Sequence, residues 1–92
     1  MIELEINYSK TSEKFVLKNK SIISFKKIRE LLEKGIRKLN NQNVNIDVKE
    51  LKGKLQGLYR IRKGNIRIIF EYYKGQIHIV NIETIDFRGD VY

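Results

Sequence analysis

The side chains of this sequence that could do chemistry are basic ones gathered in one segment. Residues 49–67 contain seven lysines and arginines and a single acid, Glu50. Over residues 68–92 the balance reverses, with two basic residues against four acidic ones. Positive charge concentrated in this way indicates a polyanionic ligand or an acidic protein partner. The alternative is that the lysines only keep the surface solvated.

The composition argues against several other kinds of chemistry. The chain has 92 residues and a formal charge of +8, with no cysteine and one histidine. Without cysteine there are no disulfides, thiol nucleophiles or thiolate metal ligands, and one histidine cannot form an imidazole cluster. We therefore expect neither a metal nor another cofactor.

The whole chain is predicted to be one domain, residues 1–92. A core of this size cannot be divided further, and no proline, repeat or linker interrupts the sequence. No apolar run approaches the ~20 residues that cross a bilayer, and Met1 is not followed by a signal-peptide pattern. We expect a soluble, cytoplasmic protein that does not act at a membrane.

The elements that must position the basic residues begin with a strand and a helix. Apolar and polar residues alternate over residues 2–7, which predicts a strand with one buried face. Ser9 is suited to cap the start of a helix over Lys10–Lys18, and Asn19 is suited to end it.

A second helix is predicted to begin near Ser21 or Ser24 and to run to about Asn40. Its apolar residues recur at helical spacing, with lysines, arginines and Glu33 between them. The apolar positions are Phe25, Ile28, Leu31, Leu32, Ile36 and Leu39. The two helices would form an amphipathic hairpin.

The rest of the chain reads as sheet. Residues 48–55 predict a turn of helix followed by a loop, and β-branched and aromatic residues then predict three strands. The strands span residues 58–63, 66–73 and 76–84, joined by two-residue turns at Gly64-Asn65 and Lys74-Gly75. The predicted fold class is α+β: an antiparallel four-stranded sheet, with the first strand at an edge and the N-terminal helical hairpin packed on one face.

The turn at Gly64-Asn65 sets the register of the first hairpin. It places Arg62 opposite Arg67, and Arg60 projects from the same face. Like charges directly across a strand pair repel each other, so this arrangement suggests that an anion binds there. The alternative is that the guanidinium groups splay into solvent or pair with Glu71 and the C-terminal acids.

The turn at Lys74-Gly75 would place the lone histidine, His78, on the arginine face. His78 would lie opposite Glu71, with Ile82 opposite Arg67, so that about 13 Å of strand separates His78 from Arg67. At that distance His78 is expected to be an exposed sheet residue rather than a catalytic base.

In order and spacing, the motifs of the C-terminal half resemble the RelE/ParE toxin superfamily. The resemblance covers about residues 47–92, and the N-terminal strand and helices agree with the family's layout. The matching runs are Leu51-Lys52-Gly53, Gly57-Leu58-Tyr59-Arg60-Ile61-Arg62, Gly64-Asn65-Ile66-Arg67-Ile68-Ile69-Phe70 and Arg88-Gly89-Asp90-Val91-Tyr92.

The resemblance implies a toxin of a type II toxin-antitoxin system. RelE-like members cleave mRNA in the ribosomal A site, where a 2'-hydroxyl attacks the adjacent phosphodiester. Such a site must hold the phosphate, stabilise added negative charge and move two protons. The implied partner is a RelB-like antitoxin, in a heterodimer or a dimer of heterodimers, whose acidic or amphipathic segment covers the basic surface.

The resemblance also implies roles for individual residues. Arg67 and Arg62 would clamp the scissile phosphate, and Arg60 would bind the RNA backbone. Arg88 would support the leaving group, and Tyr92 would orient or stack the nucleotide. Further RNA-binding candidates are Lys52, Lys54 and Lys63.

The sequence departs from the family pattern in ways that leave the general base open. The best-known pattern has lysines where this chain has Arg60 and Arg62, and arginine cannot give up its proton. Asp86 falls where a further basic residue is common. The base would then be Tyr92, Glu71, or a group of the substrate or ribosome. A ParE-like gyrase inhibitor and a catalytically weak family member are the alternative functions.

Overall fold

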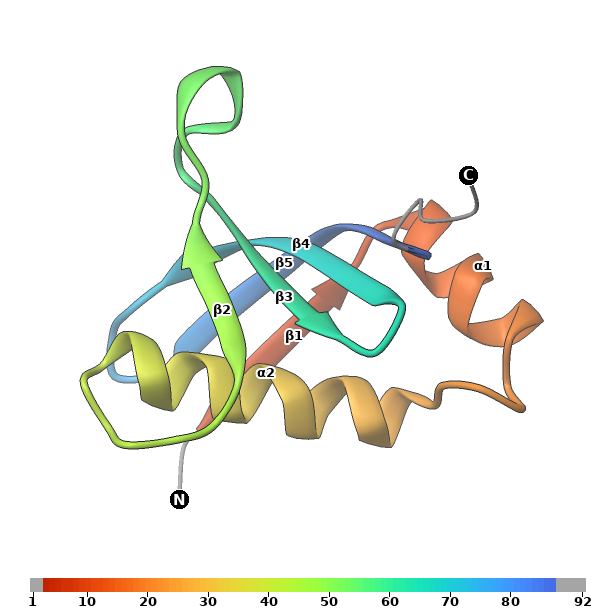
Figure 1. Ribbon diagram of the computed structural model, residues 1–92, viewed down its shortest axis with the longest axis horizontal. Coiled ribbons are helices and arrows are strands. Elements are labelled where there is room, and N and C mark those ends of the chain that lie inside the picture. Colours follow the sequence, from red (N-terminus) through yellow and green to blue (C-terminus); the bar gives the residue numbers. More distant parts are fainter. Residues whose placement is uncertain (1–2, 88–92) are drawn as a thin grey trace.

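The computed structural model describes residues 3–87 and shows two helices beside a twisted sheet (Figure 1). The elements are β1 (Leu4–Tyr8), α1 (Lys10–Lys18), α2 (Phe25–Leu39), β2 (Asp47–Glu50), the short 3-10 helix η1 (Gly53–Leu55), β3 (Leu58–Lys63), β4 (Ile66–Tyr73) and β5 (His78–Phe87). Neither described helix is long and apolar enough to cross a membrane.

The sheet has five strands in the order β1-β5-β4-β3-β2. The α+β class and the edge position of β1 are confirmed, but the prediction of four antiparallel strands is wrong, because β1 pairs parallel with β5. The fifth strand is β2, in a segment predicted to be a helical turn. Its four residues include one apolar side chain, Val48, which is too few to show an alternating pattern.

Both helices have the boundaries that their capping residues predict. Ser9 Oγ accepts a hydrogen bond from the backbone N–H of Ser12 at 3.2 Å, and α1 ends at Asn19. Ser24 Oγ accepts one from the backbone N–H of Lys27 at 3.1 Å, so α2 begins after the second of the two predicted serines. It ends before Asn40, as expected. These caps satisfy N–H groups that a helix leaves unpaired in its first turn.

The two helices contact different parts of the sheet, and the predicted hairpin over one face is not confirmed. The backbone of α2 lies nearest to β2 and β3, and its side chains also reach β1, whereas α1 lies against β5 and β1 (Figure 1). The core cluster consists of apolar side chains, and Ser12 of α1 is also fully buried. The fully buried side chains of the cluster include Ile28, Leu32, Ile36, Ile61, Ile68, Phe70 and Val80.

Gly35 allows α2 to lie close against β3. A Cβ atom at this position would stand 2.6 Å from Cδ1 and 3.2 Å from Cγ1 of Ile61, whose side chain is fully buried. Because Ile61 points toward α2, residues that alternate with it along β3 point to the opposite face of the sheet. We call that opposite face the open face.

The two hairpin turns differ from each other. The Gly64-Asn65 turn is confirmed, with Gly64 at φ 60°, a backbone conformation that favours glycine. The prediction of a two-residue turn at Lys74-Gly75 is wrong, because the loop covers residues 74–77 and β5 runs over His78–Phe87. β5 also contains a register shift, or bulge, opposite Ile69 and Phe70.

Replacement of Gly35 tests the close approach of α2 and β3. Gly35→Ala is expected to lower the free energy of unfolding by about 1 kcal/mol, since overpacking costs about 1–3 kcal/mol and better helix propensity returns about 1 kcal/mol. Urea unfolding would measure it. In a background of Ile61→Val, which removes Cδ1, the same replacement should be neutral or stabilising. An equal cost in both backgrounds would contradict this account.

Candidate nucleic-acid interface

Three arginines project from the open face of the sheet. The predicted register is confirmed: Arg62 lies opposite Arg67, and Arg60 lies opposite Ile69. Arg60 and Arg62 flank Ile61 along β3, so they point away from α2. Strand alternation and the Gly64 turn therefore bring these three side chains together.

The pair of opposed arginines is flanked by an aspartate on each side. Asp47 of β2 lies opposite Arg62, and Asp86 of β5 lies opposite Arg67. Arg62 Nε donates to Asp47 Oδ2 at 3.1 Å, and Arg67 binds Asp86 through Nε and Nη2, both at 3.0 Å. We call Asp47, Arg62, Arg67 and Asp86 the charge row. The repulsion between the arginines is therefore offset by the protein's own carboxylates.

The structure thus favours the alternative that the sequence left open, in which acids of the chain pair with the arginines. Asp86 is one of the C-terminal acids in that alternative. Glu71 is not an ion-pair partner of the three arginines; its carboxylate accepts a hydrogen bond from Asn81 Nδ2 at 3.3 Å. The second partner, Asp47, was missed because the segment that contains it was not predicted to be a strand.

Arg60 is the most deeply placed of the three arginines. The residue is 8% exposed, and its Nη2 donates to Asp47 Oδ1 at 2.8 Å. Among the described residues, no acceptor lies within hydrogen-bonding reach of its buried Nε. A buried donor without a partner costs about 1–3 kcal/mol, so the position of Arg60 Nε lowers the free energy of unfolding.

Asp47 is shared between two arginines, and its ionisation reflects them. Desolvation alone would raise the pKa of its carboxyl group. The hydrogen bond from Arg62, the charges of Arg60 and Arg62, and the hydrogen bond from Arg60 outweigh desolvation and hold the pKa below its ordinary value. Asp47 is therefore ionised at neutral pH, as the salt bridges require.

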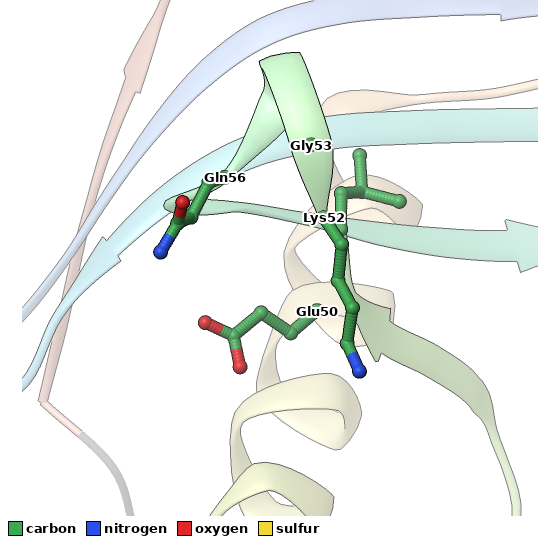
Figure 2. Close-up of a pocket in the computed structure, with 5 residues that line it drawn as sticks. Glu50, Lys52, Gly53 and Gln56 are labelled. Atoms are coloured by element: carbon green, nitrogen blue, oxygen red, sulfur yellow. The ribbon is translucent and has the colours of Figure 1, made fainter.

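The lysines predicted to bind RNA are not gathered at the charge row. Lys52 and Lys54 lie on the loop between β2 and β3, which projects beyond the sheet (Figure 1). Glu50, Lys52 and Gln56 line an open hollow of about 340 Å³ on this loop (Figure 2). Lys63 lies at the opposite end of β3. The sequence missed Lys49, which lies opposite Arg60 and shares its face.

The remaining predicted residues, Arg88 and Tyr92, lie outside the described part of the chain. Their roles stay predictions. Among the described residues, no cluster of three or more histidine, aspartate or glutamate side chains could hold a metal ion.

His78 does not lie on the arginine face, so that prediction is wrong. Its Nδ1 is 2.7 Å from Tyr72 Oη, which also accepts a hydrogen bond from Asn40 Nδ2 at the end of α2. The physical reason is the register of β4 and β5. Glu71 pairs with Asn81 instead of His78, and a shift of an odd number of residues moves a side chain to the other face.

Beyond the arginines, the open face carries a short polar chain. Asn7 Nδ2 donates to Asn81 Oδ1 at 2.8 Å and to Glu5 Oε2 at 3.2 Å, and Asn81 in turn donates to Glu71. The open face is therefore cationic over β3 and polar to acidic over β1 and β5.

The comparison with solved structures identifies the fold. The chain has a RelE-like toxin superfamily fold. A YafQ variant from E. coli matches with a TM-score of 0.62 and 16% identity, over 96% of this chain and 97% of that one. No protein-family model matches the sequence, and no curated protein does.

Two further structures are similar. A copper-bound toxin variant from Helicobacter pylori matches with a TM-score of 0.63 and 14% identity, over the full length of both chains. A chain of the RelB-RelE antitoxin-toxin complex from Methanococcus jannaschii matches with a TM-score of 0.51 and 27% identity, over 94% of each chain.

Acid unfolding of Asp47→Asn tests the contribution of the charge row to stability. Because the folded-state pKa is lowered, the stabilisation is complete above the ordinary value of 3.8 and is lost as pH falls through the lowered value. Asp47 is half exposed, so we expect the variant to lose less than about 1 kcal/mol at pH 7. In urea titrations this difference should shrink as pH falls below 3.8 and vanish once Asp47 is protonated in the folded state. A difference that persists when Asp47 is protonated would contradict an ionic origin.

Proposed function

We propose that this protein is the toxin of a type II toxin-antitoxin system and inhibits translation by cleaving mRNA in the ribosomal A site. The observation that carries the proposal is the set of three arginines on the open face, with Arg62 and Arg67 directly opposed. The fold, shared with known toxins, supports it. The reaction would be attack of a 2'-hydroxyl on the neighbouring phosphodiester.

In this reaction the arginines would bind and stabilise charge. Arg62 and Arg67 each present several N–H donors, which suit the oxygens of a phosphate and the extra negative charge of the transition state. Arg60 would bind the adjacent backbone. By family resemblance, Arg88 would support the leaving oxygen and Tyr92 would orient the nucleotide.

The proton of the attacking hydroxyl needs a base that is not an arginine. Glu71 lies on the same strand as Arg67 but four residues away, which is about 13 Å along β4. It is also held by Asn81. We therefore favour Tyr92, or a group of the ribosome or substrate, over Glu71.

The partner would be a RelB-like antitoxin in the cytoplasm, forming a heterodimer or a dimer of heterodimers. An open groove of about 400 Å³ lies between β1 and α2, lined by Ile6, Tyr8, Phe25, Lys26 and Arg29. The rings of Tyr8 and Phe25 meet edge to face at 5.0 Å. A groove lined by both apolar and cationic side chains suits an acidic, amphipathic segment.

Burial raises the pKa of the Tyr8 phenol in this groove, although the positive charge of Arg29 acts in the opposite direction. The hydroxyl therefore stays protonated at neutral pH and can donate a hydrogen bond to an acidic partner.

A second candidate function is gyrase inhibition of the ParE kind, by binding alone. The observation that favours it is the pairing of the arginines with Asp47 and Asp86, which reduces the charge available to a phosphate. A supercoiling assay with purified gyrase separates the two, since only this function predicts that gyrase cleavage complexes accumulate.

Arg67→Ala is expected to abolish toxicity and to lower A-site cleavage by about 10²- to 10³-fold, because the phosphate would lose a fixed cation. Toeprinting of a translated message with purified protein measures cleavage. Lys34→Ala is the matched control, since it removes one exposed positive charge on α2. Full cleavage by Arg67→Ala would remove this residue from the site. No cleavage by the wild type at micromolar concentration would refute the proposed reaction.

Lys26→Glu tests the partner groove. We expect the antitoxin to be a short acidic protein encoded in the adjacent reading frame. It should bind this variant at least about tenfold more weakly, because like charges would meet in the groove. Lys34→Glu on the same helix makes the same charge change away from the groove. Calorimetry of both variants gives the comparison, and equal weakening would place the antitoxin elsewhere.

A further inference from the structure

The arginines of the open face are paired with carboxylates of the chain itself. Among the described residues, Arg60 and Arg62 share Asp47, and Arg67 pairs with Asp86. The protein's own side chains therefore occupy the positions at which an anionic ligand would bind. A phosphate that binds the donor atoms engaged in these pairs must replace a carboxylate.

The two aspartates hold their arginines differently. Asp86 binds Arg67 with two parallel hydrogen bonds to a single guanidinium, the arrangement that fixes arginine geometry best. Asp47 gives one oxygen to Arg60 and the other to Arg62. Its side chain is 49% exposed, against 39% for Asp86. Asp47 is therefore the carboxylate that a ligand displaces more easily.

The state of Arg60 shows that Asp47 fits this position incompletely. The Arg60 side chain is 10% exposed, and its buried Nε has no acceptor among the described residues. Both oxygens of Asp47 are already engaged, one by each arginine. A phosphate group in the place of Asp47 would offer more acceptor oxygens, arranged tetrahedrally, to the two guanidinium groups. Asp47 therefore leaves part of the hydrogen-bonding capacity of the Arg60–Arg62 pair unused.

We propose that Asp47 is a specificity-determining residue, an internal anion that reserves the Arg60–Arg62 pair for polyanionic ligands. A single phosphate group gains the two arginines but stays beside the displaced carboxylate, which repels it. A polynucleotide gains further contacts with basic groups such as Lys49 and Lys52, and it releases bound counterions. This inference rests on the proposed function in one respect, that the polyanion is RNA.

The experiment compares two probes, inorganic phosphate and a 12-nucleotide single-stranded uridine oligomer, at low, fixed salt and neutral pH. Asp47→Asn keeps the size of the side chain and removes its charge. It should tighten phosphate binding at least about tenfold and oligomer binding no more than about threefold. Phosphate is followed by NMR titration and the oligomer by fluorescence anisotropy.

Glu83→Gln is the matched control, because it changes the net charge equally at an exposed residue of β5 outside the charge row. It should alter neither affinity by more than about twofold. Asp47→Ser is a second neutral variant and should behave like Asp47→Asn; circular dichroism confirms that each is folded. Equal phosphate affinities for Asp47→Asn and Glu83→Gln would overturn the inference. Weaker phosphate binding, or equal tightening of both probes, would overturn it too.

The outcomes separate this inference from the proposed function. A wild-type protein that fails to cleave mRNA but shows the predicted change in phosphate affinity would refute only the reaction. A protein that cleaves mRNA, while Asp47→Asn binds phosphate no better than Glu83→Gln does, would refute only the role of Asp47.

Discussion

The structure depends on how the sheet accommodates two arginines directly across a strand pair. The Gly64 turn fixes Arg62 opposite Arg67, and their repulsion would weaken the centre of the sheet if it were not offset. The compensating carboxylates come from the strands on either side, Asp47 from β2 and Asp86 from β5. Four consecutive strands are therefore tied together by charge on one face and by apolar packing on the other.

This arrangement also shapes the chemistry that the face can support. Guanidinium groups that are paired with carboxylates are well oriented, and Arg60 is buried enough to hold one conformation. Orientation before binding is what stabilises developing charge most effectively. The same pairing lowers the net charge of the face, so affinity must come from several contacts along a ligand. Pairing with carboxylates thus both orients the arginines and weakens the binding of an anion to any one of them.

The helix boundaries and the register of the arginines could be predicted from the sequence because they depend on residues close together in the chain. Serine caps gave the helix starts, and a glycine turn gave the arginine register. What could not be predicted depended on distant contacts. The strand at Asp47 has too short a pattern and is held by its pairing with β3. The position of His78 depended on a four-residue loop and on an odd register shift, neither of which the Lys74-Gly75 dipeptide indicates. Asp47, which completes the charge row, was missed for the first of these reasons, whereas Asp86 is one of the C-terminal acids that the sequence offered as partners.

The bulge in β5 has a consequence for how the chain could vary in length. Glu83 is the extra residue, because Ile82 pairs with Phe70 and Thr84 pairs with Ile69. Its backbone carbonyl accepts a hydrogen bond from Ser9 Oγ at 2.9 Å, at the start of α1. A homologous chain that lacked this residue could keep Asp86 opposite Arg67 and lose the hydrogen bond from Ser9 Oγ. An insertion or deletion at Glu83 would therefore leave Asp86 paired with Arg67. The contact between β5 and the start of α1 can thus vary among homologous chains without moving the arginines.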